Sequence, residues 1–250
     1  MSKLKQAPET TAVFFDVDDT LYDHLTPFYT AVREVAGTSD HFPYEEAYHR
    51  MRYYSDKLSH ELGGAEAMEQ SNATEHVRRE RFKLSLAEHG IKLSDEEAAR
   101  MQAAYLGCQY KIALFPGARE LMTALRDRGV LLGLITNGAP EHQTNKLEAL
   151  QLDDLIPAGH RFISGAAGWD KPDIRLFQHV NQATGTRPED CVYIGDSWRN
   201  DVVGALGAGW QAIWFNHRGV TPESDHQPHH IVCSYEELSA LLLPLLPLPQ

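Results

Sequence analysis

Three carboxylates follow directly after an apolar run near the start of the chain. The run Ala12-Val13-Phe14-Phe15 leads into Asp16-Val17-Asp18-Asp19. An apolar run that stops on acids is typical of a buried strand whose carboxyl end reaches solvent at a sheet edge. Neighbouring carboxylates raise one another's pKa unless a cation or shared protons offset the repulsion. The pattern therefore predicts a site that holds a positive charge.

The composition limits the partners of this chain. Its 250 residues carry a formal net charge of −12 and are 42% apolar, as in globular proteins. Nucleic acids and anionic membranes are bound by basic patches, and the sequence contains no run of Lys or Arg. We therefore expect neither as a partner. An anionic small substrate stays compatible with this charge, because a metal ion and a few placed cations reverse the local potential.

The cysteines and the apolar segments indicate the compartment. Cys108, Cys191 and Cys233 are odd in number and widely spaced, which is typical of a reducing environment. No apolar leader precedes the acids, and no stretch approaches the roughly 20 apolar residues of a membrane span. We expect a cytoplasmic protein without a membrane span. The sequence carries no signal for an oligomeric state.

Short apolar segments alternate with helical patterns over much of the chain. Helical signals include the segment 117–128 before Gly129, Pro172 at a first helical turn, Gly185 at a helix end, and a capping box at Ser234 and Glu237. Strands are expected at 11–16, 130–137, 161–164, 191–196, 211–216 and 230–234. This alternation predicts an α/β fold, a Rossmann-like parallel sheet with helices on both faces.

A long interval interrupts this alternation after the first strand. A parallel crossover needs only about a dozen residues, yet roughly 90 residues separate the first strand from the next α/β unit. Helical spacing recurs there at 44–62, 66–89 and 94–112, the last preceded by a capping box of Ser94 and Glu97. We therefore predict a catalytic core of residues 1–21 and 115–250 with an inserted α-helical cap domain at 22–114.

Polar groups follow the predicted strands at their carboxyl ends, where open α/β sheets bind ligands. Each group alone is an ordinary turn or cap signal. Their recurrence in this order predicts one shared site. The groups are Asp16 with Asp18, Thr136-Asn137-Gly138, Lys171, and Asp196 with Asp201.

In the residues that follow these strands, the chain resembles the haloacid dehalogenase-like (HAD) hydrolase superfamily. The insert lies where that family places its helical C1 cap, and the 33 residues between Asn137 and Lys171 are few for the alternative cap position. Dehalogenases of the superfamily generally lack the second aspartate, so the presence of Asp18 favours a phosphatase. Its membrane-spanning ATPases are excluded by hydropathy. The matching segments are FDVDDTL at 15–21, ITNG at 135–138, KP at 171–172 and GDSWRND at 195–201.

The chemistry of these side chains suits phosphoryl transfer. Asp16 is expected to be the nucleophile, because an aspartyl phosphate is reactive enough for water to cleave in a second step. Asp18 lies on the same side of an extended chain and is expected to act as general acid and base. Thr136 and Asn137 are expected to donate hydrogen bonds to the phosphoryl oxygens, and Lys171 to add a positive charge.

Oxygen ligands of this kind predict Mg²⁺ as the cofactor. The expected ligands are the Asp16 and Asp196 carboxylates and Asp18, whose main-chain carbonyl faces the metal in the family that the chain resembles. Asp201 either completes the surroundings of the metal or holds Lys171 in place.

Together these expectations describe a Mg²⁺-dependent phosphatase that acts on a small phosphorylated metabolite chosen by the cap. A phosphomutase, in which a sugar phosphate accepts the phosphoryl group, is one alternative. A non-catalytic Mg²⁺-binding regulatory module is another; a complete set of Asp16, Asp18, Thr136, Lys171 and Asp196 disfavours it.

Overall fold

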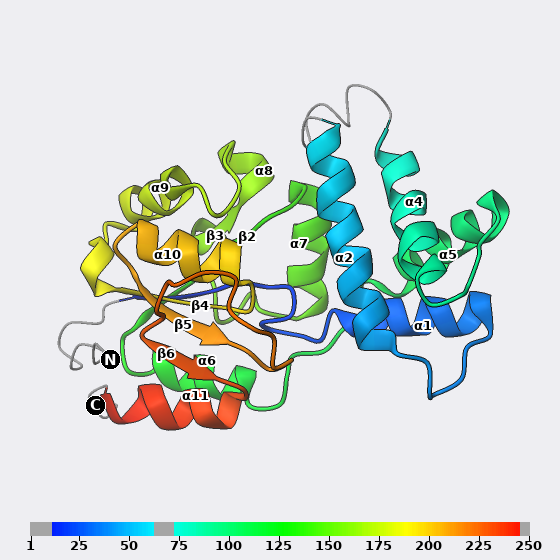
Figure 1. The fold of residues 1–250 in the computed structure, drawn as a ribbon. Coiled ribbons are helices and arrows are strands. Elements are labelled where there is room, and N and C mark those ends of the chain that lie inside the picture. Colours follow the sequence, from blue (N-terminus) through cyan, green and yellow to red (C-terminus); the bar gives the residue numbers. More distant parts are fainter. Residues whose placement is uncertain (1–11, 63–72, 246–250) are drawn as a thin grey trace. The chain divides into compact units, whose positions relative to one another are not determined.

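The computed structural model describes residues 12–62 and 73–245 of the chain (Figure 1). It divides into two compact units. Residues 1–23 and 113–250 form the first, here the core unit, and residues 24–112 form the second, the helical unit.

The core unit is built on one six-stranded sheet in which every neighbouring pair is parallel. All six strands expected from the sequence form, which confirms the α/β class. Their order is β3-β2-β1-β4-β5-β6, so the chain order reverses between β1 and β4; ligands bind at such switch points. The strands are β1 Ala12–Phe15, β2 Leu131–Thr136, β3 Arg161–Ile163, β4 Cys191–Gly195, β5 Gln211–Phe215 and β6 His230–Val232.

Helices cover both faces of this sheet (Figure 1). Helices α6 and α11 lie on one face, and α9 and α10 lie on the other. The central strands β1 and β4 are completely buried, which explains their continuous apolar sequences. The helices are α6 Ala118–Arg126, α7 Pro140–Ala149, α8 Ser164–Ala167, α9 Ile174–Thr184, α10 Gly204–Gly207 and α11 Tyr235–Leu242, with short turns η1 Ala158–His160, η2 Pro188–Asp190, η3 Trp198–Val203 and η4 Leu243–Leu245.

Two helix starts differ in detail from the sequence expectations. Pro172 does not stand in a first helical turn, because α9 begins at Ile174 after Asp173, whose side chain caps it. At α11, Ser234 accepts the expected bond from the Glu237 N–H, but the Glu237 carboxylate accepts from the N–H of Cys233. The cap signals thus locate helix ends to within one or two residues.

The described part of the helical unit contains helices and no strands. It comprises α1 Leu25–Ala36, α2 Tyr44–Glu61, α4 Thr74–Ala87 and α5 Asp95–Cys108. The capping box of Ser94 and Glu97 is present in full. Helix α1 was not expected from the sequence, and the expected helical residues 66–72 lie outside the described part. Aromatic side chains fill the core of this unit, with Phe28 and Phe82 stacked at 6.0 Å between ring centroids.

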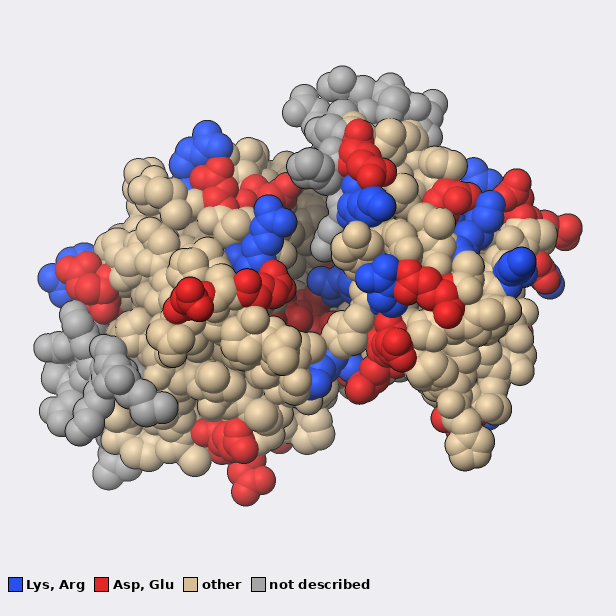
Figure 2. Space-filling view, viewed as in Figure 1, with Lys and Arg blue, Asp and Glu red and all other residues tan. Residues whose placement is uncertain are grey.

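Surface charges of both signs are interspersed on the face shown in Figure 2, without a broad basic patch there. Within residues 12–62 and 73–245, no helix combines the length and apolar character needed to cross a bilayer.

The close approach of β4 to the turn η3 depends on Gly195. A Cβ added at this position would lie 2.3 Å from Oδ2 of Asp201, so we expect Gly195→Ala to lower the free energy of unfolding by about 1–3 kcal/mol. Gly159→Ala is the matched control, because a Cβ there meets nothing within 4 Å. Urea denaturation of both variants tests this, and equal stability of the two would contradict the tight packing.

Candidate active site

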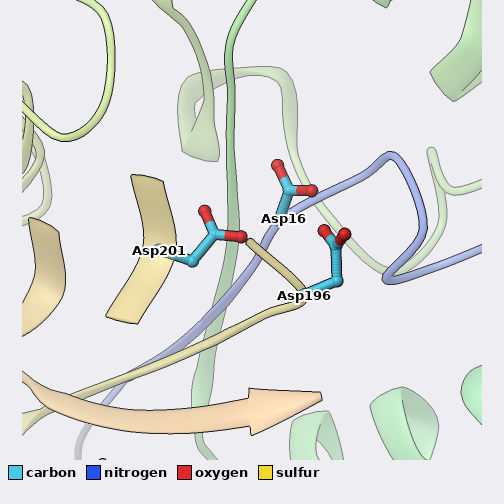
Figure 3. Close-up of side chains that lie close together, drawn as sticks. All are labelled: Asp16, Asp196 and Asp201. Carbon is cyan, nitrogen blue, oxygen red and sulfur yellow. The ribbon is translucent and has the colours of Figure 1, made fainter. Parts of the chain in front are cut away.

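Three carboxylates converge at the switch point of the sheet. Asp16 follows β1, Asp196 follows β4 and Asp201 lies in the π-helical turn η3. One oxygen from each lies within 4.8 Å of the others, and Figure 3 shows the three side chains gathered around one point. The Asp16 N–H donates to the carbonyl of Ile194 at 2.9 Å, which extends the β1–β4 ladder and places the two strand ends side by side.

Lys171 lies buried within this carboxylate cluster. Its Nζ donates to Oδ1 of Asp16 at 2.6 Å, to Oδ1 of Asp201 at 2.7 Å and to the hydroxyl of Tyr193 at 2.9 Å. An ammonium group has three N–H donors, so each has a partner here. This full use of its donors fixes the amine in one position.

Burial and charge act in opposite directions on these groups. Burial raises the pKa of Asp16 to about 7, and the Asp201 and Asp18 carboxylates add to this against the opposing effect of Lys171. For Lys171 burial alone would lower the pKa, but the Asp16 and Asp201 carboxylates outweigh it and raise the pKa of the amine. Three carboxylates beside one ammonium leave an excess of negative charge at the switch point.

Both oxygens of Asp201 are engaged. Oδ1 accepts from Lys171, and Oδ2 accepts from the N–H of Ser197 at 2.9 Å. The contact with Lys171 fits one of the two roles that the sequence left open, and membership of the carboxylate cluster with Asp16 and Asp196 fits the other.

Thr136 and Asn137 lie at the end of β2, beside the lysine. Thr136 is the buried last residue of that strand. The Asn137 amide accepts from the N–H of Lys171 at 2.8 Å and donates to its carbonyl at 3.0 Å. The Lys171–Pro172 peptide bond is cis. The Asn137 side chain thus fixes the Lys171 loop to β2, while its main-chain carbonyl accepts from Nε2 of Gln143 at 2.8 Å.

Asp18 has a cationic partner of its own. Nζ of Lys146, on α7, lies 2.8 Å from both Asp18 oxygens, and the Tyr22 hydroxyl donates to Oδ1 at 2.5 Å. The Lys146 side chain is 2% exposed and that of Asp18 is 20% exposed. These contacts orient the Asp18 carboxyl group while leaving it accessible.

Asp19 and Thr20 shape the loop after β1. Asp19 adopts a left-handed conformation with φ of 57° and accepts from Arg218 at 2.8 Å, so it is a turn residue held by a buried ion pair. The Thr20 hydroxyl accepts from the N–H of Asp196 at 3.0 Å. This contact joins the loops that follow β1 and β4.

Sequence reasoning missed Lys146, Tyr193 and Thr20. A signal for Lys146 was present, because it shares the buried face of α7 with Gln143 and Leu147. A lysine in line with core residues of an amphipathic helix indicates a buried partner of opposite charge. The strand pattern alone gives no comparable signal for Tyr193.

The residues at the switch point fit a hard divalent cation. Mg²⁺ prefers carboxylate and carbonyl oxygens together with water, and the Asp16, Asp196 and Asp201 cluster offers oxygens alone. The excess negative charge described above provides a further electrostatic reason for a cation there.

Comparison with known proteins agrees with this geometry. Residues 10–209 match the family described as haloacid dehalogenase-like hydrolase. The N-acylneuraminate-9-phosphatase of Mus musculus is 30% identical over 92% of this chain and 93% of its own length. A phosphoserine phosphatase from Thermus thermophilus is 37% identical over 57% of this chain, a match that spans 55% of that protein.

The fold agrees with solved structures of the same superfamily. The HAD-hydrolase YfnB from Bacillus subtilis superposes with a TM-score of 0.70 and 23% identity, covering 94% of this chain and 99% of that one. The chain therefore belongs to the haloacid dehalogenase-like hydrolase family, as a hydrolase of the phosphatase type.

Proposed function

We propose that this protein is a Mg²⁺-dependent phosphatase that hydrolyses a small phosphate monoester through a phosphoaspartate on Asp16. The observation that carries this proposal is the buried Lys171, which fixes the Asp16 carboxylate beside Asp196 at the switch point of the sheet. The relatives named above, a phosphoserine phosphatase and an N-acylneuraminate-9-phosphatase, support a small phosphorylated substrate.

The carboxylate cluster suits Mg²⁺, because it offers oxygen ligands. We assign its binding to the Asp16 and Asp196 carboxylates and the main-chain carbonyl of Asp18. A bound Mg²⁺ would neutralise negative charge on the Asp16 carboxylate and on the substrate phosphate. Asp201 acts on the site through Lys171, which it holds, and it also belongs to the carboxylate cluster that suits the ion.

The first transfer uses two carboxyl groups. A carboxylate oxygen of Asp16 attacks the phosphorus, a new P–O bond forms, and the bond to the leaving oxygen breaks. Asp18 gives its proton to that oxygen, so the product leaves as an alcohol. Lys171, the Thr136 hydroxyl and the Asn137 N–H stabilise the charge on the transferring phosphoryl oxygens.

Hydrolysis of the phosphoaspartate reverses the role of Asp18. Its carboxylate takes a proton from water as the water oxygen attacks the phosphorus. The P–O bond to Asp16 then breaks and inorganic phosphate leaves. Lys146 and Tyr22 are positioning residues in both steps, because they orient the Asp18 carboxyl group. We assign catalysis to residues 1–21 and 115–250, and substrate choice to a cap formed by residues 22–114.

Asp16→Asn should abolish this activity. Asparagine lacks the nucleophilic carboxylate, so we expect turnover of p-nitrophenyl phosphate with Mg²⁺ to fall by at least about a thousandfold. Asp225→Asn, at an exposed position, is the control and should retain full activity. Mass spectrometry after acid quenching should find a phosphoryl adduct on the peptide that contains Asp16. A wild-type protein without Mg²⁺-dependent turnover would instead indicate a non-catalytic module, and isomerised sugar phosphate without free phosphate would indicate a mutase.

Lys146→Met should impair turnover in a leaving-group-dependent manner. In the first transfer a displaced alkoxide needs the Asp18 proton, whereas p-nitrophenolate is stable without it, so a misplaced Asp18 slows this step more for the alkyl substrate; the later hydrolysis of the phosphoaspartate is common to both substrates. We expect kcat/KM, which reports the first transfer, to fall about tenfold more for glycerol 3-phosphate than for p-nitrophenyl phosphate. Asp18→Asn should give the same selectivity. An equal loss of kcat/KM on both substrates would contradict a role of Lys146 in positioning Asp18 for proton transfer to the leaving oxygen.

Mg²⁺ binding should depend on pH around neutrality. Because burial raises the pKa of Asp16 to about 7, much of this carboxyl group is protonated below that pH, and the ion must displace the proton. The apparent affinity should therefore fall as the pH drops below about 7. Calorimetric titration of Mg²⁺ in two buffers of different ionisation enthalpy measures the released proton. Buffer-independent heats at about pH 6 would contradict this coupling.

A further inference from the structure

Two polar side chains inside the helical unit have donors without acceptors. Nε of Arg81, on α4, and Nε2 of Gln102, on α5, are buried and have no hydrogen-bond partner among the described residues. The two side chains touch, because NH2 of Arg81 donates to Oε1 of Gln102 at 3.1 Å. Buried hydrogen-bond donors nearly always have acceptors in proteins, so two neighbouring donors without partners indicate that an acceptor is missing.

In the described part of the chain, the contacts of Arg81 are with Gln102 and two aromatic rings. Its guanidinium lies 5.1 Å from the ring centroid of Phe82 and 5.2 Å from that of Tyr105. Among the described side chains, none that contacts Arg81 is a carboxylate. Burial lowers the pKa of Arg81, and the guanidinium groups of Arg78 and Arg52 lower it further. A desolvated cation without a counterion is costly.

A second arginine and a chain of polar groups extend the same region. NH1 of Arg52, on α2, lies 3.0 Å from the Tyr48 hydroxyl and 3.2 Å from Nδ1 of His24. The other ring nitrogen of His24 lies 2.8 Å from the Tyr105 hydroxyl. The ring of Tyr105 thus connects these hydrogen-bonded polar groups to Arg81. The result is a cluster rich in donors and in positive charge.

We propose that Arg81 and Gln102, with Arg52 beside them, form an anion-binding site of the helical unit that takes a carboxylate or phosphate group. The fork of N–H groups on a guanidinium matches the two oxygens of such an anion. The anion provides the acceptor that Nε of Arg81 and Nε2 of Gln102 lack. Arg81 is only partly buried as a residue, which gives the anion access. The group comes either from a substrate with a second anionic group or from a separate anion.

Binding is tested directly on the full chain with malonate as the probe. In ¹⁵N-labelled protein, the Nε–H resonance of Arg81 is identified by its absence in Arg81→Lys. We expect this resonance to move saturably with sodium malonate and to stay in place with sodium chloride at the same ionic strength. An Arg81 resonance that responds no differently to the two salts overturns the proposal. This measurement does not require turnover, so it stands apart from the proposed function.

Gln102→Glu tests the site further, because glutamate has nearly the same shape as glutamine but carries a negative charge. The new carboxylate pairs with Arg81 from within the protein, so we expect a higher Tm and malonate affinity at least about tenfold weaker. Arg100→Gln is the matched control, because it removes the charge of an exposed arginine on α5, the helix that carries Gln102; it should bind malonate as the wild type does. Undiminished malonate binding by a folded Gln102→Glu variant overturns the assignment.

The source of the anion is distinguished by turnover, and this arm rests on the proposed phosphatase activity. 3-Phosphoglycerate and glycerol 3-phosphate differ by one carboxylate. If the substrate supplies the anion, the wild type prefers 3-phosphoglycerate, and Gln102→Glu lowers that preference in kcat/KM about tenfold. If a separate anion binds, the preference is unchanged, but malonate alters p-nitrophenyl phosphate turnover in the wild type and not in Gln102→Glu. Absence of all turnover beside an intact malonate response would reject the phosphatase proposal and leave the anion site standing.

Discussion

The buried ammonium of Lys171 is the interaction on which the site in the core unit depends. Removing a charge from water is costly unless every donor finds a partner in good geometry. Lys171 meets this condition with Asp16, Asp201 and Tyr193, while Asn137 holds its main chain. One cation therefore joins the end of β1, the strand β4, the turn η3 and the end of β2. Loss of any partner would leave a desolvated charge behind.

The two units contain clusters that lack groups of opposite charge. In the core unit, Asp16, Asp196 and Asp201 exceed the single Lys171 in charge, so the cluster suits a cation. In the helical unit, Arg81 and Gln102 have donors without acceptors, so the cluster suits an anion. Each cluster is an incomplete set of charges or hydrogen bonds that an external group completes.

Local patterns in the sequence were sufficient to predict many of the helices and strands. The strand that ends just before Asp16, the helix end at Gly185 and the capping box at Ser94 follow from short-range sterics and hydrogen bonding. The pairing of Lys146 with Asp18 and the contact of Arg81 with Gln102 were not foreseen. Each joins residues far apart in the chain, and their distances follow only from how the elements pack.

By itself the sequence determined the alternation of strands and helices, the helical insert, and the acids and lysine that follow the strands. These features depend on periodicity and on turn chemistry, which act between near neighbours in the chain. Only the tertiary structure decided that Asp201 holds Lys171, that Asn137 uses its side chain on the Lys171 loop, and that Asp18 has a lysine partner. The physical reason is that a charged group acquires its role from what surrounds it after burial, and that environment is assembled from all the packed elements at once.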